Sequence, residues 1–206
     1  MTESESNLRE LASADEKELH GYPRLLCEEV LMENPCHART WVRCAANLGS
    51  LGLLDQTFTA LDRAQSLVPP DRLHHVHTLR GQLLVQRGEF RAAELEFLRA
   101  NTLEPNEATN LVFAASAVFR SGDLVGALKH AELATDCAEG CLDEAWLNRG
   151  GYNLALKRYA EAEFCFRRSI ELEPNDAIAL ARLSDVEAIL GRERKARATD
   201  SGAAIP

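Results

Sequence analysis

Apolar and small side chains recur at steps of three and four along most of the chain, the spacing that places residues on one face of an α-helix. Trp146 and Gly150 share one face of a first predicted helix, and Ala162 and Phe166 share one face of a second. Gly150 and Ala162 are small where the two helices should cross, so the bulky Trp146 and Phe166 can fill the space around that contact. The pattern therefore predicts a pair of packed helices.

The same order of positions returns every 34 to 36 residues. A helix pair of this size cannot bury both of its faces alone, so we expect an array of stacked pairs. The predicted units are residues 38–71, 74–107, 108–141 and 143–176, followed by a partial unit at 177–196.

Both ends of the chain depart from this pattern. Residues 1–37 keep a helical stripe but lack the Trp, Gly and Ala positions of a first helix, and we interpret them as a degenerate N-terminal helical repeat or cap. Residues 197–206 lose the pattern altogether and are expected to form a flexible C-terminal tail. The array itself is thus predicted to span residues 38–196.

One unit resembles a known repeat along its whole length. The resemblance is to the 34-residue tetratricopeptide repeat, and it is carried by Trp146, Gly150, Tyr159, Ala162, Phe166, Leu172 and Pro174. It implies an all-α fold in which antiparallel helix pairs stack into a right-handed superhelical solenoid. It also implies that the first helix of each pair lines the concave side of that solenoid.

Composition and charge narrow the class of protein. The 206 residues are 46% hydrophobic, enough for a sizeable core, and carry a net charge of −9 with a pI near 5.2. This acidity argues against a nucleic-acid partner, which would require clustered Lys and Arg. The N-terminal residues lack the basic and then apolar order of a signal peptide, and no run of 18 apolar residues occurs. We expect a cytoplasmic protein without a membrane partner.

The first helices suggest where a partner would bind. Positions that the helix-pair core does not use should point into the groove, and in the middle of the array many of them are apolar. The predicted groove residues are Arg43, Leu79, Val85, Val112, Phe113, Ser116, Phe119, Arg120, Leu147, Asn148 and Arg182. An exposed apolar strip of this size usually marks a partner site. The alternative is that these side chains pack against neighbouring first helices or are covered by a terminal segment.

The remaining candidate chemistry is sparse. No nucleophile elbow, phosphate loop or paired-histidine zinc motif occurs, so we predict no catalytic residue, no cofactor and no metal, and a protein that is not an enzyme. His74, His75 and His77 form the densest titratable cluster, but without nearby carboxylates or cysteines they are more typical of surface histidines than of a metal site. The six cysteines lack Cys-x-x-Cys pairs and are interpreted as small buried hydrophobes, with a metal or redox role for Cys137 and Cys141 as the weaker alternative.

Two arginines pose a local problem, because Arg80 and Arg149 each occupy an inward position just before a glycine. Burying a guanidinium is costly, so we expect each side chain to lay its aliphatic stem along the core and to reach water.

The resemblance also suggests one specific ligand mode, a clamp of Lys, Asn and Arg that grips the terminal carboxylate of a chaperone tail. Only Asn148 and Arg182 match that pattern, and Val112 and Ile178 stand where it needs lysines, so this ligand is disfavoured. The leading hypothesis is a non-catalytic interaction scaffold that binds a peptide or helix of an unidentified protein partner in the apolar groove. The alternatives are a small acidic chaperone similar to those of type III secretion, or an accessory domain of an enzyme system. Homo-oligomerisation stays open.

Overall fold

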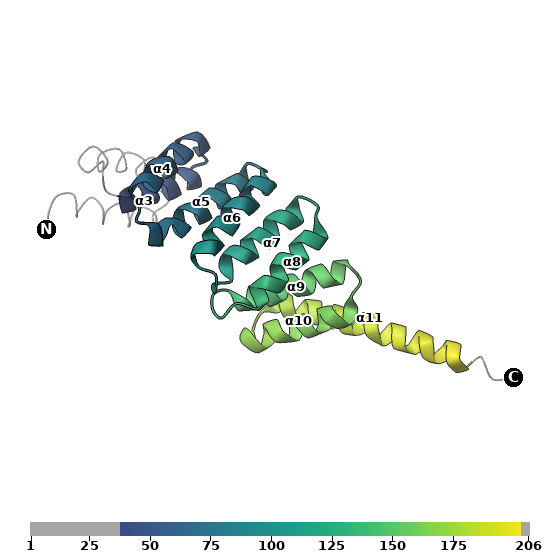
Figure 1. The fold of residues 1–206 in the computed structure, drawn as a ribbon. Coiled ribbons are helices and arrows are strands. Elements are labelled where there is room, and N and C mark those ends of the chain that lie inside the picture. The colour runs from purple at the N-terminus through teal and green to yellow at the C-terminus, as the bar shows by residue number, and fades with distance from the viewer. Residues whose placement is uncertain (1–37, 203–206) are drawn as a thin grey trace. The chain divides into compact units, whose positions relative to one another are not determined.

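The computed structural model describes the backbone of residues 38–202 and the side chains of residues 38–193. The predicted N-terminal cap and residues 203–206 of the predicted tail lie outside the described residues. Within this range the secondary structure is helical, with one short 3-10 turn, η2 (Pro70–Arg72). The α-helices are α3 (Ala38–Ser50), α4 (Leu54–Leu67), α5 (Leu73–Gln86), α6 (Phe90–Leu103), α7 (Thr109–Arg120), α8 (Leu124–Thr135), α9 (Leu142–Ala155), α10 (Tyr159–Leu172) and α11 (Ala177–Gly202) (Figure 1).

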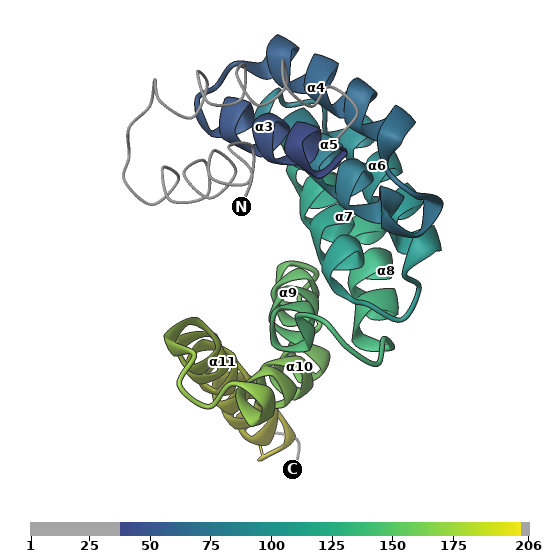
Figure 2. The ribbon, with the colours of Figure 1, turned by 90° about the vertical axis from the view of Figure 1, so that its left-hand side faces the viewer.

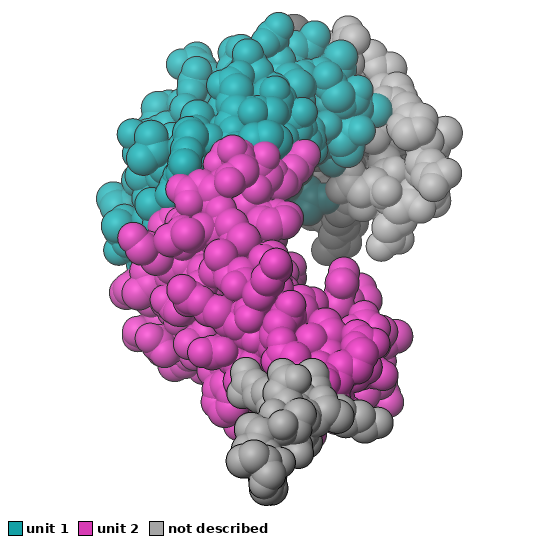
Figure 3. Space-filling model, turned by 90° about the vertical axis from the view of Figure 1, so that its right-hand side faces the viewer, with its two compact units in different colours: residues 1–103 teal, residues 104–206 magenta. Residues whose placement is uncertain are grey.

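The chain divides into two compact units, residues 1–103 and 104–206 (Figure 3). The described part of the first unit consists of two helix pairs, α3 with α4 and α5 with α6. In the second unit α7 pairs with α8 and α9 with α10, and α10 packs against both α9 and α11 (Figure 2). The predicted all-α array of helix pairs is confirmed. The helix α11 continues to Gly202, beyond the predicted boundary at residue 196.

The turn inside each pair uses a left-handed residue after the first helix. Gly52, Gly88 and Gly122 have φ values of 72°, 78° and 91°, a region that glycine enters without the steric cost of a Cβ atom. In the fourth pair the equivalent residue is Lys157, with φ of 60°. The α9–α10 turn therefore keeps the same backbone conformation with a residue for which it is unfavourable.

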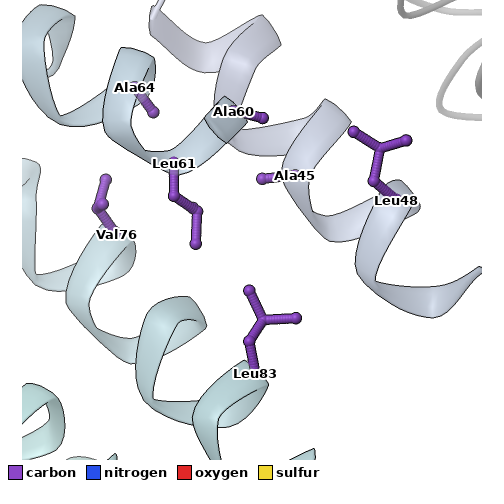
Figure 4. Close-up of a cluster of buried hydrophobic side chains, with 7 residues drawn as sticks. All are labelled: Ala45, Leu48, Ala60, Leu61, Ala64, Val76 and Leu83. Carbon is purple, nitrogen blue, oxygen red and sulfur yellow. The ribbon is translucent and has the colours of Figure 1, made fainter. Parts of the chain in front are cut away.

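The core of the first unit lies between α3, α4 and α5. Its buried side chains are Ala45, Leu48, Ala60, Leu61, Ala64, Val76 and Leu83 (Figure 4). The alanines lie where helices approach closely, and the larger Leu61, Val76 and Leu83 fill the space between them. This cluster joins the first helix pair to the second, as expected of a unit that needs a neighbour.

The predicted small-residue crossings are present in both units. A Cβ atom added to Gly150 would lie 2.6 Å from the ring of Phe166, and one added to Gly81 would lie 2.6 Å from the ring of Phe97. Both phenylalanines are buried. The two glycines thus let an aromatic ring of the second helix lie directly on the backbone of the first.

The described cysteines are not all alike. Cys165 is buried and free, and Cys137 and Cys141 are free and half-buried. Cys44 is buried in α3, as expected, but it is disulfide-bonded, which corrects its interpretation as simply a small buried hydrophobe. Local composition gave no indication of this bond, because disulfide pairing depends on which Cα atoms come within about 7 Å of each other in the folded chain.

Candidate interaction surface

The predicted groove residues of the first unit are partly covered by neighbouring helices. Leu79 packs against the cluster around Leu61 and is half-buried, so its assignment to the groove stays a prediction. Val85 and Arg43 are half-buried. The physical reason is that neighbouring first helices also contact one another, as α3 and α5 do, and the side chains between them are covered.

Two predicted groove residues of the second unit are also covered, one of them fully and one in part. Val112 is only 1% exposed, and Leu147 packs against the cluster formed by Ala162, Phe166 and Val186. Val112 therefore offers no exposed surface to a partner, whereas the assignment of the half-buried Leu147 to the groove stays a prediction. First helices contact one another in this unit too, α7 with α9 and α9 with α11. Here the alternative of packing between first helices was the better interpretation.

A smaller exposed surface remains on α7. Phe119 is 48% exposed, Ser116 and Arg120 are exposed, and Phe113 is half-buried. Ser116 and Arg120 stand four residues apart, and Phe119 three residues after Ser116, so the three side chains share one face of the helix. This face carries a large aromatic ring that the helix-pair core does not cover.

The ring of Phe119 lies on the neighbouring first helix. Its centroid is 5.2 Å from that of Tyr152 on α9, with an angle of 33° between the planes, within the range of favourable aromatic pairs. Asn148, half-buried, lies one turn before Tyr152 on the same face of α9. We name the set of Ser116, Phe119, Arg120, Asn148 and Tyr152 the Phe119 surface. Arg182, the last predicted groove residue, is exposed on α11.

Tyr152 supports this surface as a neutral group. The residue is only 6% exposed, and burial, with a smaller contribution from Glu144, raises the pKa of its phenol to about 12. The phenol is therefore protonated at neutral pH and presents an uncharged ring to Phe119.

Two arginines have a role that the sequence interpretation missed. Arg80 donates to Asp62 Oδ1 at 2.8 Å and to Gln65 Oε1 at 3.1 Å, both on the second helix of the preceding pair. Arg149 donates from Nη1 to Thr135 Oγ1 at 2.9 Å, also on the preceding second helix. Each arginine thus ties its helix pair to the one before it, which corrects the expectation that it merely reaches water. The signal was the identical placement of the two arginines before Gly81 and Gly150.

The histidine cluster divides into different environments. His77 Nδ1 lies 2.8 Å from Glu96 Oε2, and Arg99 donates to Glu96 Oε1 at 2.5 Å. His74 is buried, whereas His75 is exposed. Among the described residues no group of three or more His, Cys, Asp or Glu is placed to hold a metal ion. A search of the same part of the chain for membrane spans finds no helix that is long and apolar enough.

One unit of the chain matches a known repeat family. Residues 143–176 match the family model of the tetratricopeptide repeat. A comparison with curated proteins found no match to the sequence.

Solved structures share the fold at low sequence identity. MamA from Desulfovibrio magneticus RS-1, residues 41 to the end, is 14% identical with a TM-score of 0.68, over 84% of this chain and 97% of that chain. A tetratricopeptide repeat protein from Parabacteroides merdae is 16% identical with a TM-score of 0.70, over 95% of this chain and 76% of that one. YrrB, described as a tetratricopeptide-repeat protein with an unusual peptide-binding site, is 18% identical with a TM-score of 0.60, over 80% of this chain and 84% of that one.

Fold and contacts define a protein built from repeated helix pairs. Residues 143–176 are similar to a tetratricopeptide repeat, and the helix pairs of the described residues share the fold of the similar solved structures.

Proposed function

We propose that the chain is a non-catalytic protein-interaction scaffold and that the Phe119 surface is a contact for a peptide or helix of a protein partner. The observation that carries this proposal is the exposure of the Phe119 ring. The ring belongs to a first helix, lies outside the helix-pair core and packs against Tyr152 of the next first helix. An exposed aromatic ring gains binding energy when a partner covers it, and aromatic residues dominate binding energy in many interfaces.

The polar residues around the ring suit a peptide ligand. Ser116 and Asn148 offer a hydroxyl and an amide that can pair with a partner main chain, and Arg120 offers a positive charge beside the aromatic anchor. Such a mixture of one apolar anchor and a polar rim is typical of interfaces between folded proteins. The peptide-binding site described for YrrB supports the proposal by analogy of fold.

The proposal is tested by affinity capture from native cells with full-length wild type, Phe119→Ser and Leu133→Ser. Leu133 is 54% exposed on α8, a second helix, and is the matched control for loss of an exposed apolar side chain. We expect Phe119→Ser to lose partner proteins that wild type and Leu133→Ser both retain. Both variants should stay folded with at most a small loss of melting temperature, because neither opens a core cavity and Phe119→Ser removes only the contact with Tyr152.

Two results would count against the proposal. Partner proteins retained by Phe119→Ser and lost by Leu133→Ser would move the contact to the second helices. A strongly lowered melting temperature for Phe119→Ser would show that the ring serves the core instead.

A further inference from the structure

The first unit contains a pocket that the Phe119 surface does not include. It has a volume of about 640 Å³ and lies between the start of α3, the end of α4, η2 and the start of α5. This size falls within the range of about 300–1,000 Å³ that is usual for ligand sites. Its lining residues are Ala38, Arg39, Val42, Leu67, Val68, Pro69, Asp71, Arg72 and His75.

The walls of the pocket combine apolar and cationic groups. Val42, Leu67 and Val68 are half-buried, whereas Arg39 and Arg72 are exposed. Neither arginine side chain has a hydrogen bond or ion pair with another residue in the described range. Asp71 supplies one opposing carboxylate, so the pocket keeps a net positive charge within a chain whose net charge is −9.

The loop that carries Arg72 is held in place before any ligand arrives. Pro69 and Pro70 have restricted φ angles, and the Arg72 backbone N–H donates to Pro69 O at 2.9 Å. Buried His74 donates from Nδ1 to Asp71 O at 3.2 Å. A fixed loop loses little conformational entropy on binding, which favours a ligand that fits its present shape.

We infer that this pocket binds an acidic side chain of a protein partner, with Arg39 and Arg72 facing the carboxylate and Val42, Leu67 and Val68 taking an adjacent aliphatic side chain. Guanidinium groups recognise carboxylates through charge-assisted hydrogen bonds, and the apolar wall gives the neighbouring side chain a place out of water. This inference rests on the proposed function as an interaction scaffold. The pocket lies in the other compact unit, however, so it can fail independently of the Phe119 surface.

The test uses full-length, ¹⁵N-labelled protein titrated with two tripeptides, acetyl-Leu-Asp-Leu-amide and acetyl-Leu-Asn-Leu-amide, which differ only in the charge of the central side chain. We expect chemical-shift changes at Val42, Val68 and His75, and about tenfold weaker binding of the Asn peptide. Arg39→Gln combined with Arg72→Gln should remove the preference for the Asp peptide. Arg63→Gln, which changes an exposed arginine of α4 outside the pocket, should retain it.

Two further variants separate this pocket from its neighbours. Asp71→Asn should tighten binding of the Asp peptide, because it removes the opposing carboxylate. Phe119→Ser should leave that binding unchanged, which separates failure here from failure of the Phe119 surface. The inference is overturned by equal binding of the Asp and Asn peptides or by no shift change up to about 10 mM peptide, well above the weakest affinity expected for such a fragment. Binding of only a third probe, acetyl-Leu-Leu with a free carboxyl terminus, would overturn the assignment to an acidic side chain.

Discussion

The α5–α6 pair of the first unit and the α9–α10 pair of the second share one packing contact and differ in the residues around it. In both, a glycine of the first helix accepts a buried phenylalanine ring, Gly81 with Phe97 and Gly150 with Phe166. In both, an arginine beside that glycine bonds to the preceding second helix. The contact that sets the crossing of the two helices is thus kept.

The surroundings of this shared contact differ in chemistry. In α5–α6 the buried Glu96 holds His77 and Arg99 in a polar cluster. In α9–α10 the residue that corresponds to His77 is Trp146, whose ring lies 5.7 Å from Phe164, with the guanidiniums of Arg149 and Arg168 over it at 5.2 and 5.7 Å. The helix crossing therefore requires the glycine and the phenylalanine, whereas the positions around them accept either ionic or aromatic contacts.

Cys165 stands in α10 where Glu96 stands in α6. Burial raises the pKa of the Cys165 thiol to about 11, so the thiol stays protonated at neutral pH. The second pair thus has an uncharged group at the position that anchors the ionic cluster in the first pair.

The largest effect should come from the shared rings. Phe97→Ala and Phe166→Ala should each lower the free energy of unfolding by about 3–5 kcal/mol, since each removes a buried ring that lies on a helix backbone. Urea unfolding followed by tryptophan fluorescence measures both, because Trp41 reports on the first unit and Trp146 on the second. A loss below about 1 kcal/mol at either site would show that the crossing does not depend on that ring.

Substitutions of Glu96 and Cys165, which occupy equivalent positions, should lower the free energy of unfolding by different amounts. Glu96→Ala should cost about 1–3 kcal/mol, because His77 is left largely buried without its acceptor. Cys165→Ala should cost about 1 kcal/mol or less, because it removes only one small apolar group. Equal losses in urea titrations of the two variants would contradict the difference drawn between the pairs.

The inter-pair arginines should give smaller and unequal losses. Arg80→Gln should cost about 0.5 kcal/mol, because its partner Asp62 is largely exposed and surface ion pairs contribute little. Arg149→Gln should cost about 1 kcal/mol, because it removes both the bond to Thr135 and the contact with the Trp146 ring. The salt dependence is the control: only the Arg80 effect should shrink in high salt.

The smallest expected effect is a gain in stability at the α9–α10 turn. Lys157→Gly should stabilise the protein by about 0.5–1 kcal/mol, because glycine adopts the left-handed conformation without a steric cost. Gly88→Lys in the α5–α6 turn, also with positive φ, should destabilise by about 1 kcal/mol. Thermal melts of the two variants that shift in the same direction would contradict this account of the turns.

The sequence predicted those features that depend on short-range spacing. The helix pairs and the Gly150–Phe166 crossing follow from steps of three and four residues, which place known residue types on known faces. Leu79, Val112 and Leu147 could not be assigned this way, because their burial depends on contacts between first helices of successive pairs. The left-handed conformation of Lys157 could not be predicted either. Lys157 occupies the turn position of Gly52, Gly88 and Gly122, but the sequence does not show that these glycines have positive φ angles.

Within the candidate surface, Phe119 and Arg120 were predicted and lie exposed, whereas Tyr152 was missed. Tyr152 stands between an inward and an outward position of α9, so helical periodicity alone does not decide its side. Its contact with Phe119 comes from the lateral approach of α7 and α9, which is a property of the stack rather than of either helix.

The most direct test of the interaction surface is site-specific photo-crosslinking in native cells, with a benzoylphenylalanine placed at position 119 in one protein and at position 133 in another. The account predicts a discrete cross-linked partner band from position 119 that competes with excess unlabelled wild-type protein, and no such band from position 133. A competed band from position 133 alone would contradict the claim that partners contact the chain through Phe119.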